Sequence, residues 1–210
     1  MKRYHHPDLR AALLDAALLE LKEKGSRRFS LRQVAARAGV SHAAPYRHFS
    51  DKDALLATLV LEGMRSLTTA LREANRGPPA EARERLGRLG RAYVAFGRSH
   101  PQILSLIFSD LGFKALGTAS PDHTDKAEYD AFGELESTVL QCQREGSLDP
   151  DRDPGVLSLL VWSTVHGLTI LYTENVIPSM ISERGLRADQ AESEILRALG
   201  EIFHSKTRGS

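Results

Sequence analysis

Apolar residues recur every three or four positions along most of the chain, which is the spacing of amphipathic α-helices. In the first such run, residues 8–24, Leu13, Ala17 and Leu21 share one face, and Gly25 follows where a helix end is expected. No segment keeps the strict alternation of a half-buried β-strand. The pattern therefore predicts an all-α protein of about nine helices.

Capping residues and helix breakers set the boundaries of these helices. Residues 30–33 and 50–53 have the spacing of capping boxes, which begin helices. A Gly-Val-Ser turn at residues 39–41 separates two short helices, and Gly-Pro-Pro at 77–79 ends a long one. The helices are predicted at about residues 8–24, 30–38, 41–49, 51–75, 80–98, 101–116, 125–145, 154–173 and 188–204.

The segment from Pro154 to Thr173 carries no charge over twenty residues, which is long enough to span a bilayer. However, Ser, Thr and His side chains interrupt it, and its larger apolar residues form a stripe. A helix buried by its own subunit and by a partner explains this pattern better than lipid. We therefore predict a homodimer and no membrane association. The residues expected to be buried in the dimer are Leu157, Leu160, Val161, Leu168, Ile195, Leu199 and Ile202.

The composition agrees with a globular protein, because 41% of the 210 residues are hydrophobic. The single cysteine, Cys142, excludes an internal disulfide and indicates a reducing compartment. The N-terminal residues lead into a charged segment without the apolar run of a secretory signal. We therefore expect a cytoplasmic protein.

The net charge of +1 hides an uneven distribution. Residues 1–52 carry eleven Lys or Arg against five acidic residues, which gives +6, and residues 53–210 carry −5. A basic region next to an acidic remainder suggests that only one part of the chain meets a polyanion. The charge therefore indicates that residues 1–52 contact a polyanion and that residues 53–210 have a different role.

The sequence from Leu31 to Phe49 has the requirements of a helix-turn-helix unit. Ala35 is small enough for two helices to cross, and Gly39 tolerates the positive φ of the turn. Ser41 is placed to cap the second helix, whose N-terminal face enters the major groove in such proteins. The alternative is an ordinary corner between two helices without a DNA-binding role. The outward residues of the second helix are predicted to be His42, Ala43, Ala44, Tyr46 and Arg47.

The residues around this unit resemble the N-terminal domain of TetR-family transcriptional regulators. The resemblance covers about the first 60 residues, and its most specific part is Ala38-Gly39-Val40-Ser41 with Tyr46, His48, Phe49 and Lys52. Farther along, Trp162 with His166-Gly167 is similar to the Trp-His-Gly C-terminal domain of one branch of that family. Pro45 departs from the family pattern and removes a backbone donor, so no particular operator sequence is carried over.

The resemblance implies a regulator, repressing in the usual case, that binds a palindromic operator on double-stranded DNA as a homodimer and is released by a small-molecule effector. It also implies a DNA-binding domain over residues 1–52 and an effector-binding and dimerisation domain over residues 53–210. The helix over residues 51–75 would connect the two functions. The residues assigned to DNA binding are Ser30, Arg32, Ser41, His42, Ala43, Ala44, Tyr46, Arg47, His48 and Lys52. Those assigned to an effector pocket are Tyr93, Phe96, His100, Phe108, Trp162 and His166, each of which also suits ordinary core packing.

The sequence offers little for catalysis or metal binding. It contains no glycine-rich phosphate loop, no Gly-x-Ser-x-Gly elbow and no His-Glu-x-x-His motif. Its histidines lack the spacing of a zinc site, so we predict no catalytic residues, no metal and no cofactor. Two alternatives stay open at this point: a DNA-binding regulator without a small-molecule effector, and a small all-α enzyme.

Overall fold

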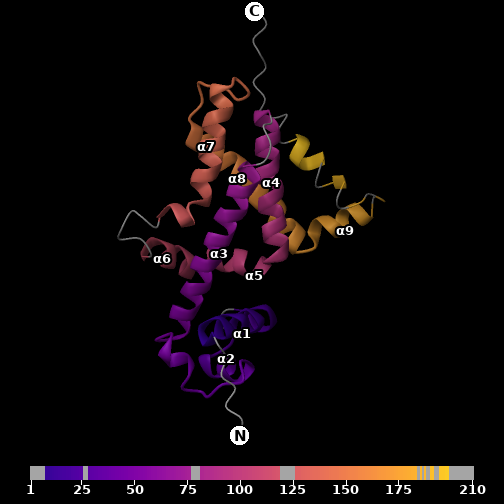
Figure 1. Ribbon diagram of the computed structural model, residues 1–210. Helices are drawn as coiled ribbons and strands as arrows, with labels where there is room; N and C mark the ends of the chain where they lie inside the picture. Colours follow the sequence, from indigo (N-terminus) through magenta and orange to yellow (C-terminus); the bar gives the residue numbers. More distant parts are fainter. Residues whose placement is uncertain are drawn as a thin grey trace, which may run out of the picture. The chain divides into compact units, whose positions relative to one another are not determined.

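The structure is a computed structural model that describes residues 8–25, 28–76, 81–118, 126–183, 185, 187, 190–191 and 194–198 (Figure 1). The described residues form α-helices and 3-10 helices and contain no β-strand, which confirms the predicted all-α class. The helices are α1 (Leu9–Lys24), α2 (Leu31–Arg37), the 3-10 helix η1 (Pro45–Arg47), α3 (Lys52–Asn75), α4 (Ala82–Ser99), α5 (Pro101–Ile107), α6 (Asp110–Thr118), the 3-10 helix η2 (Lys126–Tyr129), α7 (Ala131–Arg144), α8 (Pro154–Thr173) and α9 (Val176–Ser182).

The backbone divides into two compact units. The first unit comprises residues 1–64 and 102–125, and the second comprises residues 65–101 and 126–210. Helix α3 contributes residues to both units. This division describes backbone packing, so the predicted functional boundary after residue 52 stays a prediction.

In the first unit, α1 packs against α2, and η1 packs against α2. Buried side chains from α1, α2 and the first part of α3, such as Leu13, Val34 and Leu55, form its core. Helix α5 approaches α3 closely at Gly63, where a β-carbon would lie only 2.3 Å from Ile103 Cγ2. A side chain at residue 63 would therefore push these two helices apart.

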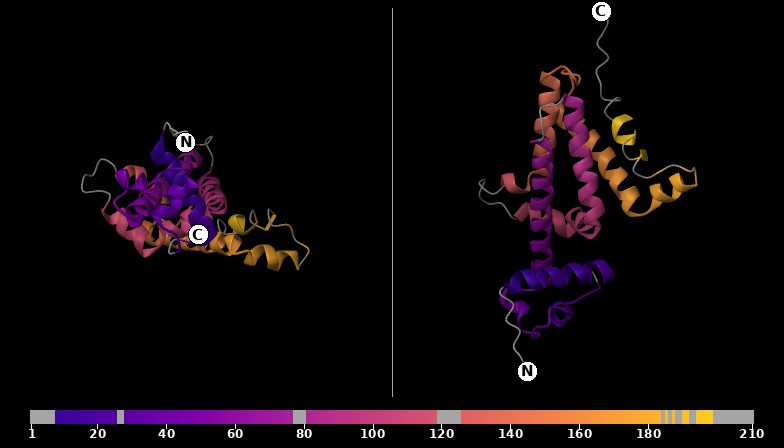
Figure 2. Two further views of the ribbon diagram at one scale, coloured as in Figure 1. Left: turned by 90° about the horizontal axis from the view of Figure 1, so that it is seen from below. Right: turned by 45° about the vertical axis from the view of Figure 1, so that its right-hand side comes forward.

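In the second unit, α4, α7 and α8 pack against one another, and the views of Figure 2 show these helices alongside each other. Buried residues such as Val94, Val139 and Val165 fill the space between them. Residues 194–198 are helical as well, and Leu196 is buried, 3.2 Å from where a β-carbon on Gly90 would lie. The rest of the predicted C-terminal helix, including Leu199 and Ile202, lies outside the described residues.

The capping residues explain where the helices begin. Ser30 and Gln33 form the predicted capping box at the start of α2, and the Asp153 side chain accepts a hydrogen bond from Val156 N (2.9 Å) at the start of α8. The second predicted box is wrong, because Asp51 rather than Ser50 caps α3, by accepting a hydrogen bond from the N–H of Ala54 (2.8 Å).

Two predicted helices differ from the structure. Residues 41–49 form turns and the short 3-10 helix η1 instead of an α-helix. The predicted helix over residues 101–116 is divided into α5 and α6. At that break the Ser109 hydroxyl donates to Leu106 O (2.6 Å) and accepts from Gly112 N (3.2 Å), so Ser109 ends one helix and begins the next. Helix α9 lies where no helix was predicted.

Helices α3 and α8 are both long and apolar enough to cross a membrane by length and composition alone, a test that core helices of soluble proteins also pass. Helix α8 buries Leu157, Val161 and Leu168 within its own unit. It leaves Leu159 and Leu160 about half exposed. Among the described residues that were assigned to a dimer interface, Leu160 and Ile195 are the two that remain exposed in the single chain.

Candidate functional site

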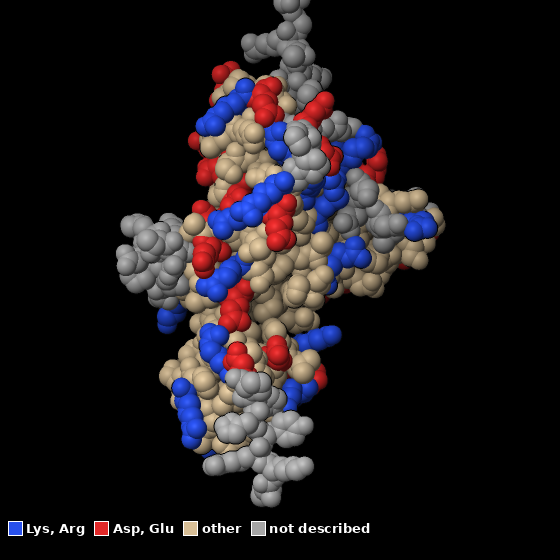
Figure 3. Space-filling view, viewed as in Figure 1, with Lys and Arg blue, Asp and Glu red and all other residues tan. Residues whose placement is uncertain are grey.

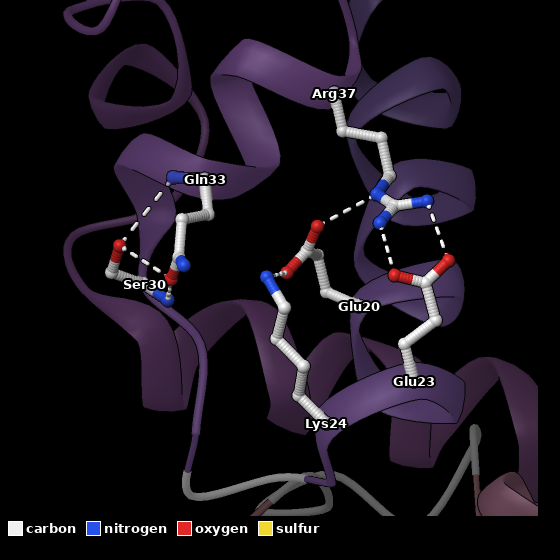
Figure 4. A network of polar contacts seen from close by, with 6 residues as sticks. All are labelled: Glu20, Glu23, Lys24, Ser30, Gln33 and Arg37. Carbon is white, nitrogen blue, oxygen red and sulfur yellow. Dashed lines mark hydrogen bonds and ion pairs between the residues drawn. The ribbon is translucent and has the colours of Figure 1, made fainter.

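A charged network connects α1 to α2 in the first unit (Figure 4). Glu20 is only 3% exposed, and its carboxylate accepts hydrogen bonds from Lys24 Nζ (2.8 Å) and Arg37 Nε (2.6 Å). The Arg37 guanidinium also pairs with Glu23 through its two terminal nitrogens. These four residues are called the Glu20 clamp below. Because Arg37 is the last residue of α2, the clamp holds the end of that helix directly before the turn.

The clamp is neutral overall, with two carboxylates and two cations. The hydrogen bonds from Lys24 and Arg37 hold the pKa of Glu20 below its usual value, against the opposing effect of burial. The same carboxylates raise the pKa of Arg37. Glu20 therefore stays ionised in the interior because both of its oxygens are occupied by charged donors.

The turn after α2 has the geometry that the sequence indicated. Gly39 adopts a φ of 69°, in the left-handed region where a β-carbon is unfavourable. The backbone then forms bonds between residues three apart, with Ala44 N donating to Ser41 O (2.9 Å). An α-helix would need the N–H of residue 45 for that carbonyl, and Pro45 has none. The proline therefore explains why η1 replaces the predicted α-helix.

The burial of residues 41–48 shows which of their side chains face outward. Ala44 and Pro45 are buried, so the predicted outward position of Ala44 is wrong. Tyr46 is 54% exposed, which is unusual for a large aromatic side chain. The remaining predicted residues of the segment, Ser41, His42, Ala43, Arg47 and His48, are all exposed.

Polar and basic groups surround the outward residues. Ser30 is exposed at the N-terminus of α2, where unpaired backbone N–H groups attract an anion. Arg32 is exposed in the first turn of the same helix. Lys52 begins α3, and its ammonium group lies 5.5 Å from the centre of the Phe29 ring. Figure 3 shows Lys and Arg side chains around the part of the molecule that α1 and α2 form.

In the second unit, an aromatic cluster joins α4, α7 and α8. The Tyr93 hydroxyl lies 2.7 Å from His166 Nδ1 and accepts a hydrogen bond from Trp162 Nε1 (3.3 Å). Trp162 and His166 also lie with their ring centres 5.8 Å apart. On its other side Trp162 meets Phe132 edge to face, with ring centres 6.1 Å apart. We call Tyr93, Phe132, Trp162 and His166 the Tyr93 cluster.

The Tyr93 cluster is uncharged at neutral pH. Burial raises the pKa of the Tyr93 hydroxyl to about 12 and lowers the pKa of the His166 imidazole. The Tyr93 oxygen accepts a hydrogen bond from Trp162 Nε1 and shares a second hydrogen bond with Nδ1 of a neutral His166. The structure thus brings together three residues that the sequence assigned to one pocket. It adds Phe132, which sequence reasoning missed because its position depends on how α7 packs.

The other predicted pocket residues lie elsewhere. Phe96 and His100 stack on each other in α4, with ring centres 5.0 Å apart. Phe108 belongs to the first unit, where its ring contacts Phe113. The six predicted residues are therefore divided between the two units. Only Tyr93, Trp162 and His166 share a hydrogen-bonded cluster.

The described part of the chain contains no group of three His, Cys, Asp or Glu residues placed to hold a metal ion. Cys142 is completely buried, and burial raises the pKa of its thiol to about 11, as expected for a packing residue.

Comparison with known proteins places the chain in a family. Residues 13–59 match the model for bacterial regulatory proteins of the tetR family, and residues 86–188 match the model for a tetracyclin repressor-like C-terminal domain. The chain belongs to the TetR family. It is therefore a transcriptional regulator with an N-terminal DNA-binding domain rather than an enzyme, and the enzyme alternative is excluded.

Individual relatives agree with this TetR-family assignment. Over 68 residues the chain is 43% identical to an uncharacterised HTH-type transcriptional regulator of Haemophilus influenzae, a match that spans 32% of this chain and 33% of that relative. A solved structure of a protein of unknown function from Rhodococcus sp. RHA1 is 30% identical, with a TM-score of 0.74 and 97% of both chains covered. The TetR-family regulator PfmR from Thermus thermophilus shares the fold at 20% identity, with a TM-score of 0.66 and coverage of 97% and 99%.

Proposed function

We propose that this TetR-family protein is a cytoplasmic, ligand-responsive repressor that binds a palindromic operator as a homodimer and leaves it when a small molecule binds. The observation that carries the DNA-binding part is the outward set His42, Tyr46 and Arg47. These side chains project from a segment that buried Ala44 and Pro45 anchor. Side chains held outward on a rigid support are suited to reading base edges.

The residues proposed to contact DNA have different roles, which follow from the chemistry of their side chains. Ser30 and Lys52 lie at helix N-termini, where a hydroxyl, backbone N–H groups and an ammonium group suit phosphate oxygens. Arg32, Ser41 and His48 are also assigned to contacts with the phosphate backbone of the DNA. Arg47 carries the bidentate donors that recognise guanine, and the Ala43 methyl suits contact with thymine. Ala44 supports the segment from inside.

Selection from a random DNA library tests this assignment. The protein should enrich an inverted repeat whose half-sites are about one helical turn apart, and log affinity should fall with log salt by about 0.9 per phosphate contacted. Lys52→Ala should weaken binding to all DNA sequences alike, whereas Arg47→Ala should change the DNA sequence that the protein prefers. Arg152→Ala removes one positive charge from the second unit and serves as the control. Equal binding to random and selected duplexes would contradict the proposal.

The dimer part of the proposal rests on α8. Its uncharged surface leaves Leu160 48% exposed, together with Leu159 and Leu171. A second copy of the same helix would cover these side chains symmetrically and complete a four-helix bundle with the C-terminal helices. Leu160→Glu should therefore yield monomers in light scattering. Leu19→Glu is the matched control, because Leu19 is also 48% exposed but lies on α1. Dissociation by both variants, or by neither, would remove α8 as the interface.

The effector part rests on the Tyr93 cluster. Apolar rings with a few converging polar atoms are typical of small-molecule sites. A ligand that rearranges Trp162 would move groups on α4, α7 and α8 together. Trp162→Phe should weaken the effector response and leave operator affinity in its absence unchanged. The alternative, a regulator without a small-molecule effector, predicts that no compound in a thermal-shift screen changes operator affinity.

A further inference from the structure

Residues 41–48, which carry the outward side chains proposed to read DNA, are called the reading segment below. A buried aromatic residue follows them directly, since Phe49 is only 3% exposed. The N–H groups of His48 and Phe49 both donate to Pro45 O, at 2.9 Å each. These two bonds join the end of η1 to Phe49 through the backbone. A contact that fixes the Phe49 ring therefore also fixes the point at which the reading segment ends.

A charged side chain from α1 lies over this ring. The Arg10 guanidinium carbon is 6.0 Å from the centre of the Phe49 ring, the separation at which an arginine is attracted to an aromatic face. Arg10 Nη1 also donates to Glu62 Oε1 on α3, at 2.9 Å. Arg10 thus links α1, the end of the reading segment and α3, which come from three separate parts of the sequence.

Helix α1 holds the chain before the reading segment as well. In the Glu20 clamp, the Glu20 carboxylate binds Arg37, the last residue of α2, directly before the turn that leads into the reading segment. Arg10, near the beginning of α1, lies over the residue directly after that segment. Side chains of one helix therefore contact the chain on both sides of the residues that face outward.

The ion pair with Glu62 distinguishes Arg10 from the residues that suit phosphate contacts. Lys52 also lies over an aromatic ring, that of Phe29 at 5.5 Å, but it begins α3, where backbone N–H groups favour an anion. Arg10 is paired with a carboxylate, and this pair would have to separate before the guanidinium could bind a phosphate. The arrangement therefore favours a role within the protein over a direct contact with DNA.

We propose that Arg10 is a positioning residue for DNA reading: Glu62 holds its guanidinium over Phe49, and Phe49 fixes the end of the reading segment. This inference rests on the proposed function, because it requires that residues 41–48 read DNA. The pair is about half exposed and adds little to the stability of the fold. Its effect is on the fraction of molecules whose reading segment has the binding geometry, and the apparent affinity falls in proportion to that fraction.

Glu62→Gln tests the inference, because the two roles for Arg10 predict opposite changes in the affinity for the operator that the wild-type protein selects. If Glu62 holds Arg10 in place, the variant should bind about threefold more weakly, although it makes the protein more positive. If Arg10 contacts a phosphate, loss of the carboxylate frees the guanidinium and strengthens binding. Glu73→Gln is the matched control, since it removes the same charge from an exposed position on α3 and should not weaken binding. Unchanged or tighter binding by Glu62→Gln would overturn the inference.

Binding to random DNA separates positioning from a simple loss of charge. Arg10→Ala should lower the ratio of operator affinity to random-duplex affinity about threefold, because phosphate contacts alone support binding to random DNA. The slope of log affinity against log salt should stay that of the wild-type protein. A phosphate contact would instead lower both affinities alike and reduce the slope by about 0.9, and that result would rule out a positioning role.

A double variant shows whether Glu62 acts through Arg10. Arg10→Ala combined with Glu62→Gln should bind the operator no more weakly than Arg10→Ala alone, because the second change removes a partner that no longer has a function. Additive losses would mean that Glu62 acts through another group, against the inference. Thermal denaturation of each single variant should stay close to that of the wild-type protein, since the pair is exposed. A large loss of thermal stability would assign the weaker binding to folding and would equally contradict the proposed role.

Selection with the wild-type protein separates failure of the proposed function from failure of this inference. If the wild-type protein enriches no sequence from the random library, the proposed function fails, and the role of Arg10 fails with it. If it enriches an operator and Glu62→Gln binds that operator as tightly as the wild-type protein does, the DNA-reading function stands and only the role of Arg10 is wrong.

Discussion

Among the described residues, each unit has a polar network around a buried group, Glu20 in the first unit and Tyr93 in the second. The two networks are built from different kinds of group. The Glu20 clamp of the first unit consists of full charges, with a carboxylate that is 3% exposed between two cations. The Tyr93 cluster of the second unit consists of neutral hydroxyl, imidazole and indole groups. Both are satisfied internally, but the free energy lost when a partner is removed differs, because an unpaired buried charge is far more costly than an unpaired neutral group.

This difference suits the two functions. A DNA-reading segment needs a fixed angle between α1 and α2, and charged donors with strict geometry hold that angle. A ligand site needs groups that can exchange one partner for another, and neutral hydrogen bonds allow this exchange at lower cost. Removing one partner from each network in turn tests whether the two networks differ in this way.

The largest effect is expected for Arg37→Ala, which leaves Glu20 buried with only Lys24 as a partner. The free energy of unfolding should fall because a buried carboxylate loses a charged donor, and operator affinity should fall with it because α2 is no longer held. Urea denaturation followed by circular dichroism, at fixed protein concentration, measures the first effect. Arg65→Ala is the control, since Arg65 and Glu128 are about half exposed and their pair should contribute less than about 1 kcal/mol. Equal losses in the two variants would contradict a special role for the Glu20 clamp.

Tyr93→Phe should have the next largest effect. The substitution removes the oxygen that joins Trp162 to His166, so two partly buried polar groups lose a partner and the protein loses about 1–2 kcal/mol. The emission of Trp162 should change in the same variant. Tyr129→Phe makes the same chemical change at an exposed hydrogen bond and should have a smaller effect. A larger loss at Tyr129 would show that the Tyr93 cluster does not stabilise its unit.

A smaller effect is expected at Ser30, where a structural and a functional role can be separated. Ser30→Ala removes the cap of α2 and should cost about 1 kcal/mol. Ser30→Asp keeps a capping oxygen and adds a negative charge beside the proposed phosphate contact. We expect Ser30→Asp to retain stability in thermal denaturation and to bind DNA more weakly than Ser30→Ala does. The opposite order of affinities would remove Ser30 from the DNA interface.

The smallest effect is the dependence of stability on pH, which should begin in the second unit. The pKa of His166 is lowered in the folded protein, so stability is complete above about pH 6.5 and is lost as the pH falls toward the lowered value. The pKa of Glu20 is lowered from about 4.5, so its contribution is complete above that pH and is lost below it. Urea titrations monitored by Trp162 emission should therefore show a first loss of stability as the pH falls below about 6.5, and His166→Gln should remove that loss. A first loss that persists in His166→Gln would assign the effect to another group.

Local sequence rules predicted most helix boundaries because those boundaries depend on nearby residues. Helix α8 begins at Pro154 after the cap Asp153 and ends at Thr173, as the uncharged run indicated. The capping box at Ser30 and the positive φ of Gly39 also follow from local chemistry. The segment after Ser41 differs from its prediction because Pro45 lacks the N–H that an α-helix needs at that position.

Features that depend on packing between distant segments could not be predicted. Glu20 interrupts an otherwise apolar stretch of α1, and only the position of Arg37 in the fold explains its burial. Trp162 and His166 are four residues apart in the sequence, but their link to Tyr93 joins residues about seventy positions apart. The division of α5 from α6 at Ser109 likewise depends on a side-chain bond that competes with helix continuation.

The proline in the reading segment has a further consequence for the thermodynamics of DNA association. Pro45 restricts the backbone before DNA arrives, and Ala44 beside it is already buried. A segment that is ordered in advance buries little additional apolar surface of its own on binding. Its contribution to the heat-capacity change of association is therefore small. Operator affinity should accordingly vary less with temperature than in a regulator whose reading segment folds only on the DNA.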